Sequence, residues 1–545
     1  MKNAFYSQAK KLRDIANRFD TESNALKISI IRDMASNRIP FTGALSSYHE
    51  TLLFIMAFPS DKKIFDLAER EVLRLAELLK KQSEKVKETY VNSGIPFINY
   101  RASFSHDCTR WLLTHPDCKV LIHKIDNTTF DLNEALKVTV PSQERSETTA
   151  GFTNEELLNE LCPNKELQLS YIINELSRLD NLPYIKDHYY DGLGIQTNVV
   201  PKNKLFSKPY NKIDIPEVFY HNDLVKHFDV DELLNRKLPA ETVLTVSQKR
   251  DLITVIKNSM AMTERETDPA TYLKEDTIHL YHLERGVSIA IYGMPQARQL
   301  PMESYIGYTL FKNGYPAAYA GGWIFGWRSD YGLNIYDQFR GGESAYMVAQ
   351  ILRLYRQLFQ INYFQVEATQ FGLDSPEGIA TGVFWFYYKL GFRPLDEQLR
   401  LLAKTEFQKI KTRKGYRSSE KTLLKFTESN VFLPLGKKVQ PGVYDITNKV
   451  KKMIIKKYKG NSQHAEHDCV NEFLDKTSCK DSFTNEEHEV LKEVSLWASA
   501  MNISDKNQLR IMIQMIKLKP VDEYRYQEQL RLFFPPHPRP FSRSK

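Results

Sequence analysis

The stretch SYIGYTLFKNGYPAAYAGGWIFG (Ser304–Gly326) decides the fold of the central part of the chain. Its side chains alternate in character on both sides of Asn313-Gly314, and such alternation is typical of strands that bury one face. Asn-Gly favours the positive φ angles that a two-residue type I′ turn needs at both central positions. The sequence therefore predicts a β-hairpin that turns at Asn313 and Gly314.

The sequence on both sides of this hairpin extends the predicted sheet. Before it, TIHLYHLERGVSIAIYG (Thr277–Gly293) alternates in the same way. After it we predict a strand GLNIYDQF (Gly332–Phe339), a helix Ser344–Gln360 with an apolar stripe, a strand Asn362–Thr369 and a helix that ends at Leu390. This order of elements implies a mixed sheet with a crossover helix.

The remainder of the chain has mostly helical patterns, so the predicted fold class is α+β. Pro141–Gly151 is rich in Ser, Thr and Glu without an apolar period, and it is predicted to be a linker. The predicted parts are a mainly helical N-terminal domain (1-140), a helical and loop-rich middle region (152-262), the mixed-sheet domain (270-400), a helical C-terminal extension (401-534) and a disordered tail (535-545).

Composition narrows the classes of partner. The chain has 75 Lys and Arg residues against 67 Asp and Glu residues, and a net charge of +8 over 545 residues is too mild to predict nucleic-acid binding. Five scattered cysteines suit a reducing compartment, and no apolar run approaches the roughly 18 residues that a membrane span needs. We expect a cytoplasmic protein without a membrane span. His464, His467, Cys469 and Cys479 have no common zinc-site spacing, so no metal is expected.

A loop of small residues precedes the predicted helix Ser344–Gln360. Gly341 and Gly342 would let backbone N–H groups approach a phosphate closely, and a helix N-terminus adds partial positive charge. Arg340 would add a charge-assisted contact to a diphosphate. The sequence therefore predicts an anion site where this helix begins.

Two motifs here resemble the GNAT superfamily of N-acetyltransferases. Asp337–Ala345 is similar to the family's phosphate loop, [Q/R]-x-x-G-x-[G/A], and FYYKLGF (Phe386–Phe392) is similar to its F-Y-x-x-L-G-F motif. The resemblance covers about Asp276 to Asp396, while the chain as a whole loosely resembles large bacterial proteins with a similar segment. It implies acetyl-CoA, or another acyl-CoA, as co-substrate. The residues implied to hold it are Gln338, Phe339, Arg340, Gly341, Gly342, Ser344 and Ala345.

The resemblance also implies catalytic roles. Tyr387 would protonate the departing CoA thiolate, and Asp337 or Glu367, near the ends of the two predicted central strands, would take the proton of the amine. The alternative for Tyr387 is an aromatic residue of the core, for Arg340 a surface charge, and for the two carboxylates a solvated sheet edge. Glu343 departs from the motif, because a carboxylate near a phosphate is unfavourable unless it points outward as a residue of the first helical turn.

The predicted function is transfer of an acyl group, in the simplest case acetyl, from acyl-CoA to an amine of a small molecule or a protein. Two alternatives remain open: an aminoacyl-tRNA-dependent transferase of the same fold, and a non-catalytic scaffold or binding protein with a degenerate form of it. The sequence leaves the acceptor, the acyl group and a homo-oligomeric assembly undecided.

Overall fold

A computed structural model of the chain describes residues 2–126, 128–435, 441–479 and 482–534. Helical regions flank a mixed sheet, which confirms the predicted α+β class. The predicted disordered tail, 535-545, lies outside the described residues. Within the described ranges, none of the helices combines the length and the apolar character that crossing a bilayer demands.

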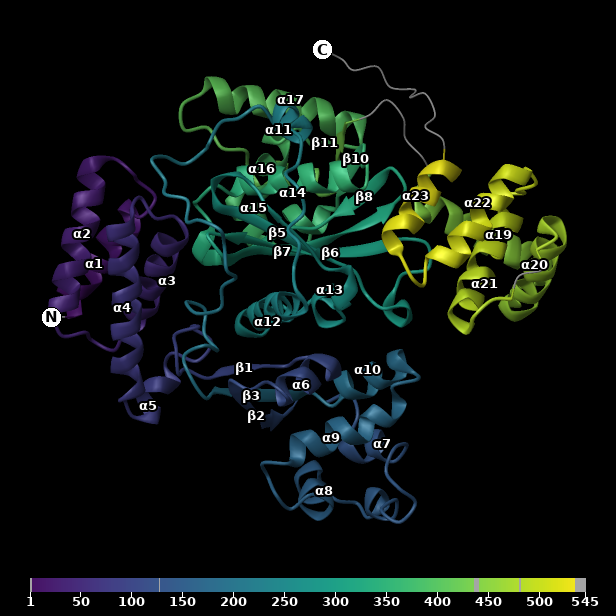
Figure 1. Ribbon diagram of the computed structural model, residues 1–545, viewed down its shortest axis with the longest axis horizontal. Helices are drawn as coiled ribbons and strands as arrows, with labels where there is room; N and C mark the ends of the chain where they lie inside the picture. The colour runs from purple at the N-terminus through teal and green to yellow at the C-terminus, as the bar shows by residue number, and fades with distance from the viewer. Residues whose placement is uncertain (1, 127, 436–440, 480–481, 535–545) are drawn as a thin grey trace.

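The chain begins with a bundle of helices at one end of the molecule (Figure 1). Its helices are α1 (Lys2–Ile15), α2 (Thr21–Ser36), α3 (Gly43–Ala57), α4 (Lys62–Lys80) and the short α5 (Glu84–Glu88). The buried face of α4 includes Ile64, Val72 and Leu79. Asp61 caps this helix by accepting a hydrogen bond from the Ile64 N–H at 2.9 Å.

A three-stranded antiparallel sheet with its own core follows the bundle. It consists of β1 (Tyr100–Ala102), β3 (Ile195–Pro201) and β2 (Cys118–Ile125), with α6 (His106–Leu113), α7 (Leu132–Leu136), α8 (Asn154–Leu161), α9 (Gln168–Leu176) and α10 (Pro183–Gly192). Because β3 pairs with β1 and β2, Pro141–Gly151 lies within one domain and does not separate two. The predicted border between 1-140 and 152-262 is therefore wrong: local composition marks a turn there, while strand pairing joins residues on both sides.

The central sheet has nine strands in the order β11-β12-β10-β8-β7-β6-β5-β4, with β9 paired to β7. Asn313 and Gly314, with φ of 46° and 84°, connect β6 and β7, so the predicted hairpin is confirmed. The strands are β4 (His279–His282), β5 (Val287–Tyr292), β6 (Ser304–Lys312), β7 (Tyr315–Phe325), β8 (Arg328–Tyr331), β9 (Asn334–Ile335), β10 (Tyr363–Val366), β11 (Arg393–Pro394) and β12 (Val431–Pro434).

Helices cover both faces of this sheet (Figure 1). On one side are α12 (Val246–Thr263) and α13 (Asp268–Thr271), and on the other are α14 (Ser344–Leu358), α15 (Pro376–Thr381), α16 (Val383–Lys389) and α17 (Glu397–Thr412). The remaining helices near the sheet are α11 (Val230–Asn235) and α18 (Glu420–Phe426). Because β12 returns to the sheet after α18, the sheet domain extends past the predicted end at residue 400.

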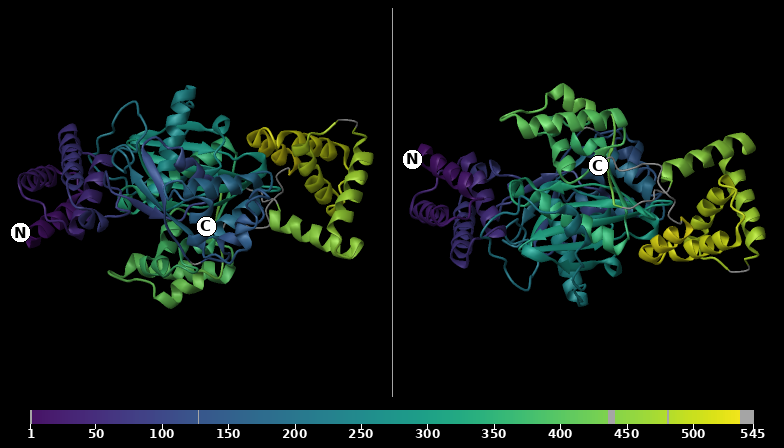
Figure 2. Two further views of the ribbon diagram at one scale, coloured as in Figure 1. Left: turned by 90° about the horizontal axis from the view of Figure 1, so that it is seen from below. Right: turned by 90° about the horizontal axis from the view of Figure 1, so that it is seen from above.

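The C-terminal helices form a further layer with its own apolar core. They are α19 (Val443–Tyr458), α20 (Ser462–Thr477), α21 (Asn485–Ala500), α22 (Lys506–Leu518) and α23 (Glu523–Phe533). Figure 2 shows these helices and the N-terminal bundle at opposite ends of the central sheet. The Gln527 side chain on α23 accepts a hydrogen bond from the Gly326 N–H at 2.8 Å and donates one to the Ile324 carbonyl at 2.9 Å.

Candidate functional site

Strands β8 and β10 lie side by side for a short distance and then separate. They form the parallel pair of the sheet among the described strands, with Ser329 opposite Phe364 and Asp330 opposite Gln365. The chain after β8 bends back to pair with β7 as β9, whereas β10 leads into the 3-10 turn η7 (Ala368–Phe371). Ligands of open sheets bind beyond the carboxyl ends of parallel strands, where such a crevice opens.

The first of these strands differs from its prediction. The predicted strand Gly332–Phe339 contains only the two-residue β9 and the 3-10 turn η6 (Asp337–Phe339), whereas the strand beside β10 is β8 (Arg328–Tyr331), which lies before it. The chain reverses directly after β7 at Gly326. Arg328 and Asp330 therefore lie in the sheet, on β8.

The predicted phosphate loop does lie at the start of a helix. Arg340–Glu343 connects η6 to α14, and the first N–H groups of any α-helix, here including those of Ser344 and Ala345, lack partners within the helix. Gly341 has a φ of 94°, with open space where a Cβ would lie. Gly342 is tightly packed, since a Cβ there would lie 2.5 Å from Cζ of Phe58 in the N-terminal region.

Glu343 does not point outward, which was the condition under which its carboxylate would suit a phosphate loop. It is 1% exposed and precedes α14 as its N-cap residue. Its carboxylate lies 2.8 Å from Lys312 Nζ and 2.6 Å from an Arg285 guanidinium nitrogen, and it accepts a hydrogen bond from the Val225 N–H at 3.0 Å. These partners come from distant parts of the chain, which is why the local helix rule failed.

The charges of this cluster balance one another. Burial alone would raise the pKa of Glu343, but His221, Lys312 and Arg285 outweigh it and hold that pKa well below its usual range. Burial lowers the pKa of Lys312 to about 8, although Glu343 opposes this change. Lys312 and Arg285 thus neutralise the negative charge of Glu343 beside the phosphate loop.

Two other predicted residues form exposed ion pairs. Arg340 lies 2.9 Å from Asp337 and 2.9 Å from Glu377, the latter on α15, and about half of the Arg340 side chain is exposed. Asp337 follows neither central strand directly, because β8 ends at Tyr331, and its side chain is 78% exposed. Gln338 lines cavities between the loop and the N-terminal bundle, while Phe339 is buried.

Tyr387 lies on α16 with only 2% of its surface exposed. Its ring packs edge-on against Phe392 with centroids 5.6 Å apart, and burial raises its pKa. Its phenol is also one of the groups that raise the pKa of Tyr331, the last residue of β8. Its ring also packs edge-on against Phe371 of η7, with centroids 6.3 Å apart, so Tyr387 is an aromatic core residue that lies near the carboxyl end of β10.

Carboxylates gather on the opposite face of the same strands. Glu367 follows β10 directly and is exposed, while Asp330 on β8 is half-buried. Burial raises the pKa of Glu303, just before β6, to about 7, and the nearby charges of Asp330 and Glu367 add to this effect. Burial also raises the pKa of Asp330.

Sequence reasoning missed Glu303 and Asp330. Asp330 was missed because the central strand was placed after it, and the run Arg328–Tyr331 has no polar–apolar alternation that would mark it as a strand. No pattern near Glu303 indicates that it lies beside Asp330, since their proximity depends on the pairing of β6, β7 and β8.

Candidate metal ligands are already occupied by protein cations. His106, Asp107 and Asp180 lie close enough together to hold an ion. However, Lys186 Nζ lies 3.0 Å from Asp107 and 2.6 Å from Asp180, in the place that a metal would take.

Comparisons with family models, curated proteins and solved structures gave no match to this chain.

Proposed function

We propose that this protein is a GNAT-like N-acyltransferase that moves an acyl group, in the simplest case acetyl, from acyl-CoA to an amine. One observation carries the proposal: the β8–α14–β10 unit. In it, two parallel strands separate at their carboxyl ends, a glycine loop leads into the crossover helix, and Tyr387 lies near the carboxyl end of β10. This is the strand–helix–strand arrangement that the motif resemblance implies.

The loop supplies the groups that a diphosphate requires. Backbone N–H groups at the start of α14 and the helix dipole favour an anion there, and Gly341 leaves open space beside the chain. Arg340 would exchange the exposed carboxylates of Asp337 and Glu377 for the diphosphate. Ion pairs as exposed as these contribute about 0 to 1 kcal/mol, so the exchange costs little.

The buried Glu343 is compatible with an anion at this loop. Its negative charge is balanced by Lys312 and Arg285, and it is not available to repel a phosphate at full strength. The same cluster fixes the N-terminus of α14 to β6, which keeps the loop amides in place.

The two faces of the separated strands offer an acid and a base. Glu303, with a pKa of about 7, would accept the proton of the acceptor ammonium. The free amine attacks the thioester carbonyl, a C–N bond forms, the C–S bond breaks, and the nitrogen releases its second proton to solvent, which later returns a proton to Tyr387 and takes the one from Glu303. Tyr387 then donates its phenolic proton to the CoA thiolate, and its raised pKa keeps that proton in place until then. We assign the base to Glu303, with Asp330 and Glu367 beside it, in preference to Asp337, which pairs with Arg340.

The test is to measure the melting temperature with and without millimolar acetyl-CoA, and thiol release across a panel of amines. Acyl-CoA that binds the native state must raise the melting temperature. Arg340→Ala is expected to abolish this rise, whereas the matched variant Glu377→Gln keeps it because Arg340 retains its charge. The absence of any stabilisation would contradict the proposal, and stabilisation without thiol release would favour a binding protein.

A further inference from the structure

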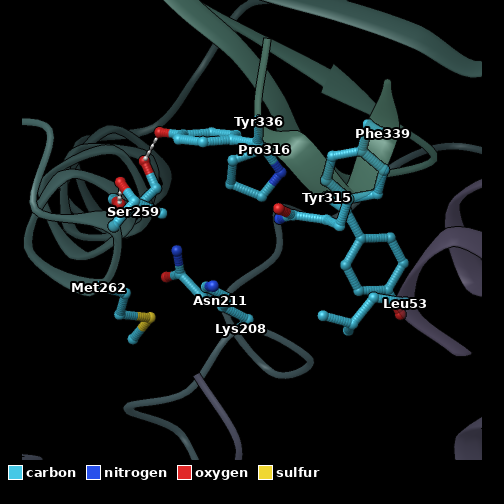
Figure 3. A pocket seen from close by; sticks show the side chains of 11 residues that line it. Leu53, Lys208, Asn211, Ser259, Met262, Tyr315, Pro316, Tyr336 and Phe339 are labelled. Carbon is cyan, nitrogen blue, oxygen red and sulfur yellow. Dashed lines mark hydrogen bonds between the residues drawn. The ribbon is translucent and has the colours of Figure 1, made fainter. Parts of the chain in front are cut away.

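Two adjoining cavities lie between the N-terminal helices and the loop that leads into α14. The larger has a volume of about 180 Å³, and its lining includes Arg13, Glu50, Phe54 and Gly341. The smaller, about 20 Å³, is lined among others by Lys208, Asn211 and Ser259, which Figure 3 shows around it. Gln338 lines both cavities, so they meet at this side chain.

Lys208 brings an uncompensated positive charge to this place. Its backbone N–H donates to the Gly94 carbonyl at 3.1 Å, and its stem lies so close over Gly94 that a Cβ there would be 2.3 Å from Cδ of the lysine. An ion pair requires a distance of at most 4.0 Å between nitrogen and oxygen. Among the described residues, no carboxylate oxygen lies that close to Nζ of Lys208. Burial lowers the pKa of Lys208, and Glu50 is the carboxylate that counteracts this most.

Glu50, an exposed residue, brings a negative charge from the other side. It belongs to α3 and lines the larger cavity. Burial raises its pKa, and Lys208 is the cation that acts on it most strongly. No cationic nitrogen of the described part of the chain reaches ion-pair distance from its carboxylate either. Lys208 and Glu50 thus influence each other across Gln338 without making contact.

We propose that the two cavities form a binding site for a small zwitterion, an amino acid or a molecule with the same charges, whose carboxylate meets Lys208 and whose ammonium meets Glu50. A simple anion would use only Lys208 and a simple cation only Glu50, whereas a zwitterion makes a charge-assisted contact with each of the two cavity walls. The larger cavity slightly exceeds the roughly 150 Å³ that holds a benzene molecule, and Phe54 gives it an apolar wall for a side chain.

This site adjoins the proposed diphosphate site, but binding a zwitterion here requires none of the acyl-transfer chemistry. Gln338, Arg340 and Gly341 nevertheless belong both to the larger cavity and to the loop before α14. A zwitterion bound here would join that loop to α1 and α3 of the N-terminal bundle. The N-terminal residues then acquire a role as one wall of a ligand site.

The experiment measures binding of the protein amino acids, one at a time, to the full chain without CoA. A thermal-shift screen at millimolar concentration is followed by calorimetric titration of the amino acid that gives the largest shift. Its methyl ester lacks the carboxylate and its N-acetyl derivative lacks the ammonium, so each removes one of the two proposed contacts. Loss of one charge-assisted contact is expected to weaken binding about tenfold or more.

Variants test the two protein charges separately. Lys208→Met and Glu50→Gln are each expected to weaken binding about tenfold or more, while Lys202→Met, an exposed lysine of the same chain segment, leaves it unchanged. If Lys208→Met fails to fold, Glu50→Gln on the accessible side of the cavity decides alone. The proposal is overturned if no amino acid binds, if either derivative binds as tightly as its parent, or if Glu50→Gln binds normally.

Discussion

Replacing Glu343 with Gln is expected to destabilise the junction between α14 and β6. The side chain keeps its shape but loses the negative charge that compensates Lys312, which is 0% exposed, and Arg285, which is partly exposed. Removing one member of a buried ion pair typically costs 3 to 5 kcal/mol, because the remaining charge is left without a partner. Arg285 reaches solvent and can be hydrated, so we expect the lower end, about 3 kcal/mol.

The assay is native-state hydrogen exchange of the amides in β6 and α14, which follows local opening in a chain of several domains. Glu377→Gln serves as the control, because it removes an equally charged group from an exposed ion pair and should change stability by less than about 1 kcal/mol. The double variant Glu343→Gln with Lys312→Met should recover part of the loss, since it also removes the buried ammonium.

The effect of Glu343→Gln also depends on pH in a defined direction. The folded-state pKa of Glu343 lies below its ordinary value of 4.5, so its stabilisation is present above pH 4.5 and is lost as the pH falls toward the folded pKa. The stability difference between wild type and variant should therefore shrink below pH 4.5. A variant that opens no more readily than the Glu377→Gln control at neutral pH would refute the assigned role of the cluster.

Three further predictions concern the loop and the proposed chemistry. Gly342→Ala should loosen the contact with Phe58, because its Cβ would lie 2.5 Å from that ring, and faster hydrogen exchange around Phe58 would report it. If Glu303 is the base, kcat/KM rises with pH through about 7, because the carboxyl group accepts a proton only when it is deprotonated. The variant Glu303→Gln should lose this rise, and an unchanged pH profile of the variant would exclude Glu303 as the base. Tyr387→Phe preserves the aromatic packing and should slow turnover about 10²-fold while leaving the CoA-induced rise in melting temperature intact; equal turnover would exclude proton donation by Tyr387.

Features set by neighbouring residues were predictable from the sequence. The hairpin at Asn313-Gly314 follows from the backbone angles that these two residues adopt easily. The crossover helix α14 follows from its apolar stripe, and the glycine loop before it was placed correctly. In each case the deciding chemistry lies within a few positions along the chain.

Features that depend on distant partners were not predictable. The four-residue β8 is too short and too polar to be distinguished from its surroundings, and only its pairing with β7 and β10 defines it. Glu343 looked like a first-turn acid, since Lys312 and Arg285 are invisible to a local rule. Lys208 and Glu50 line adjoining cavities only because the N-terminal bundle packs against the loop before α14.

The hydrogen bonds from α23 have a consequence for how the protein can be shortened. Gln527 satisfies the backbone groups of Gly326 and Ile324, and Arg531 donates to the Phe359 carbonyl at 2.9 Å. A chain that stopped before α23 would leave these polar groups inside the protein without partners, at the end of β7 and of α14. Helix α23 therefore completes the interior of the central sheet domain from a position 201 to 203 residues further along the chain.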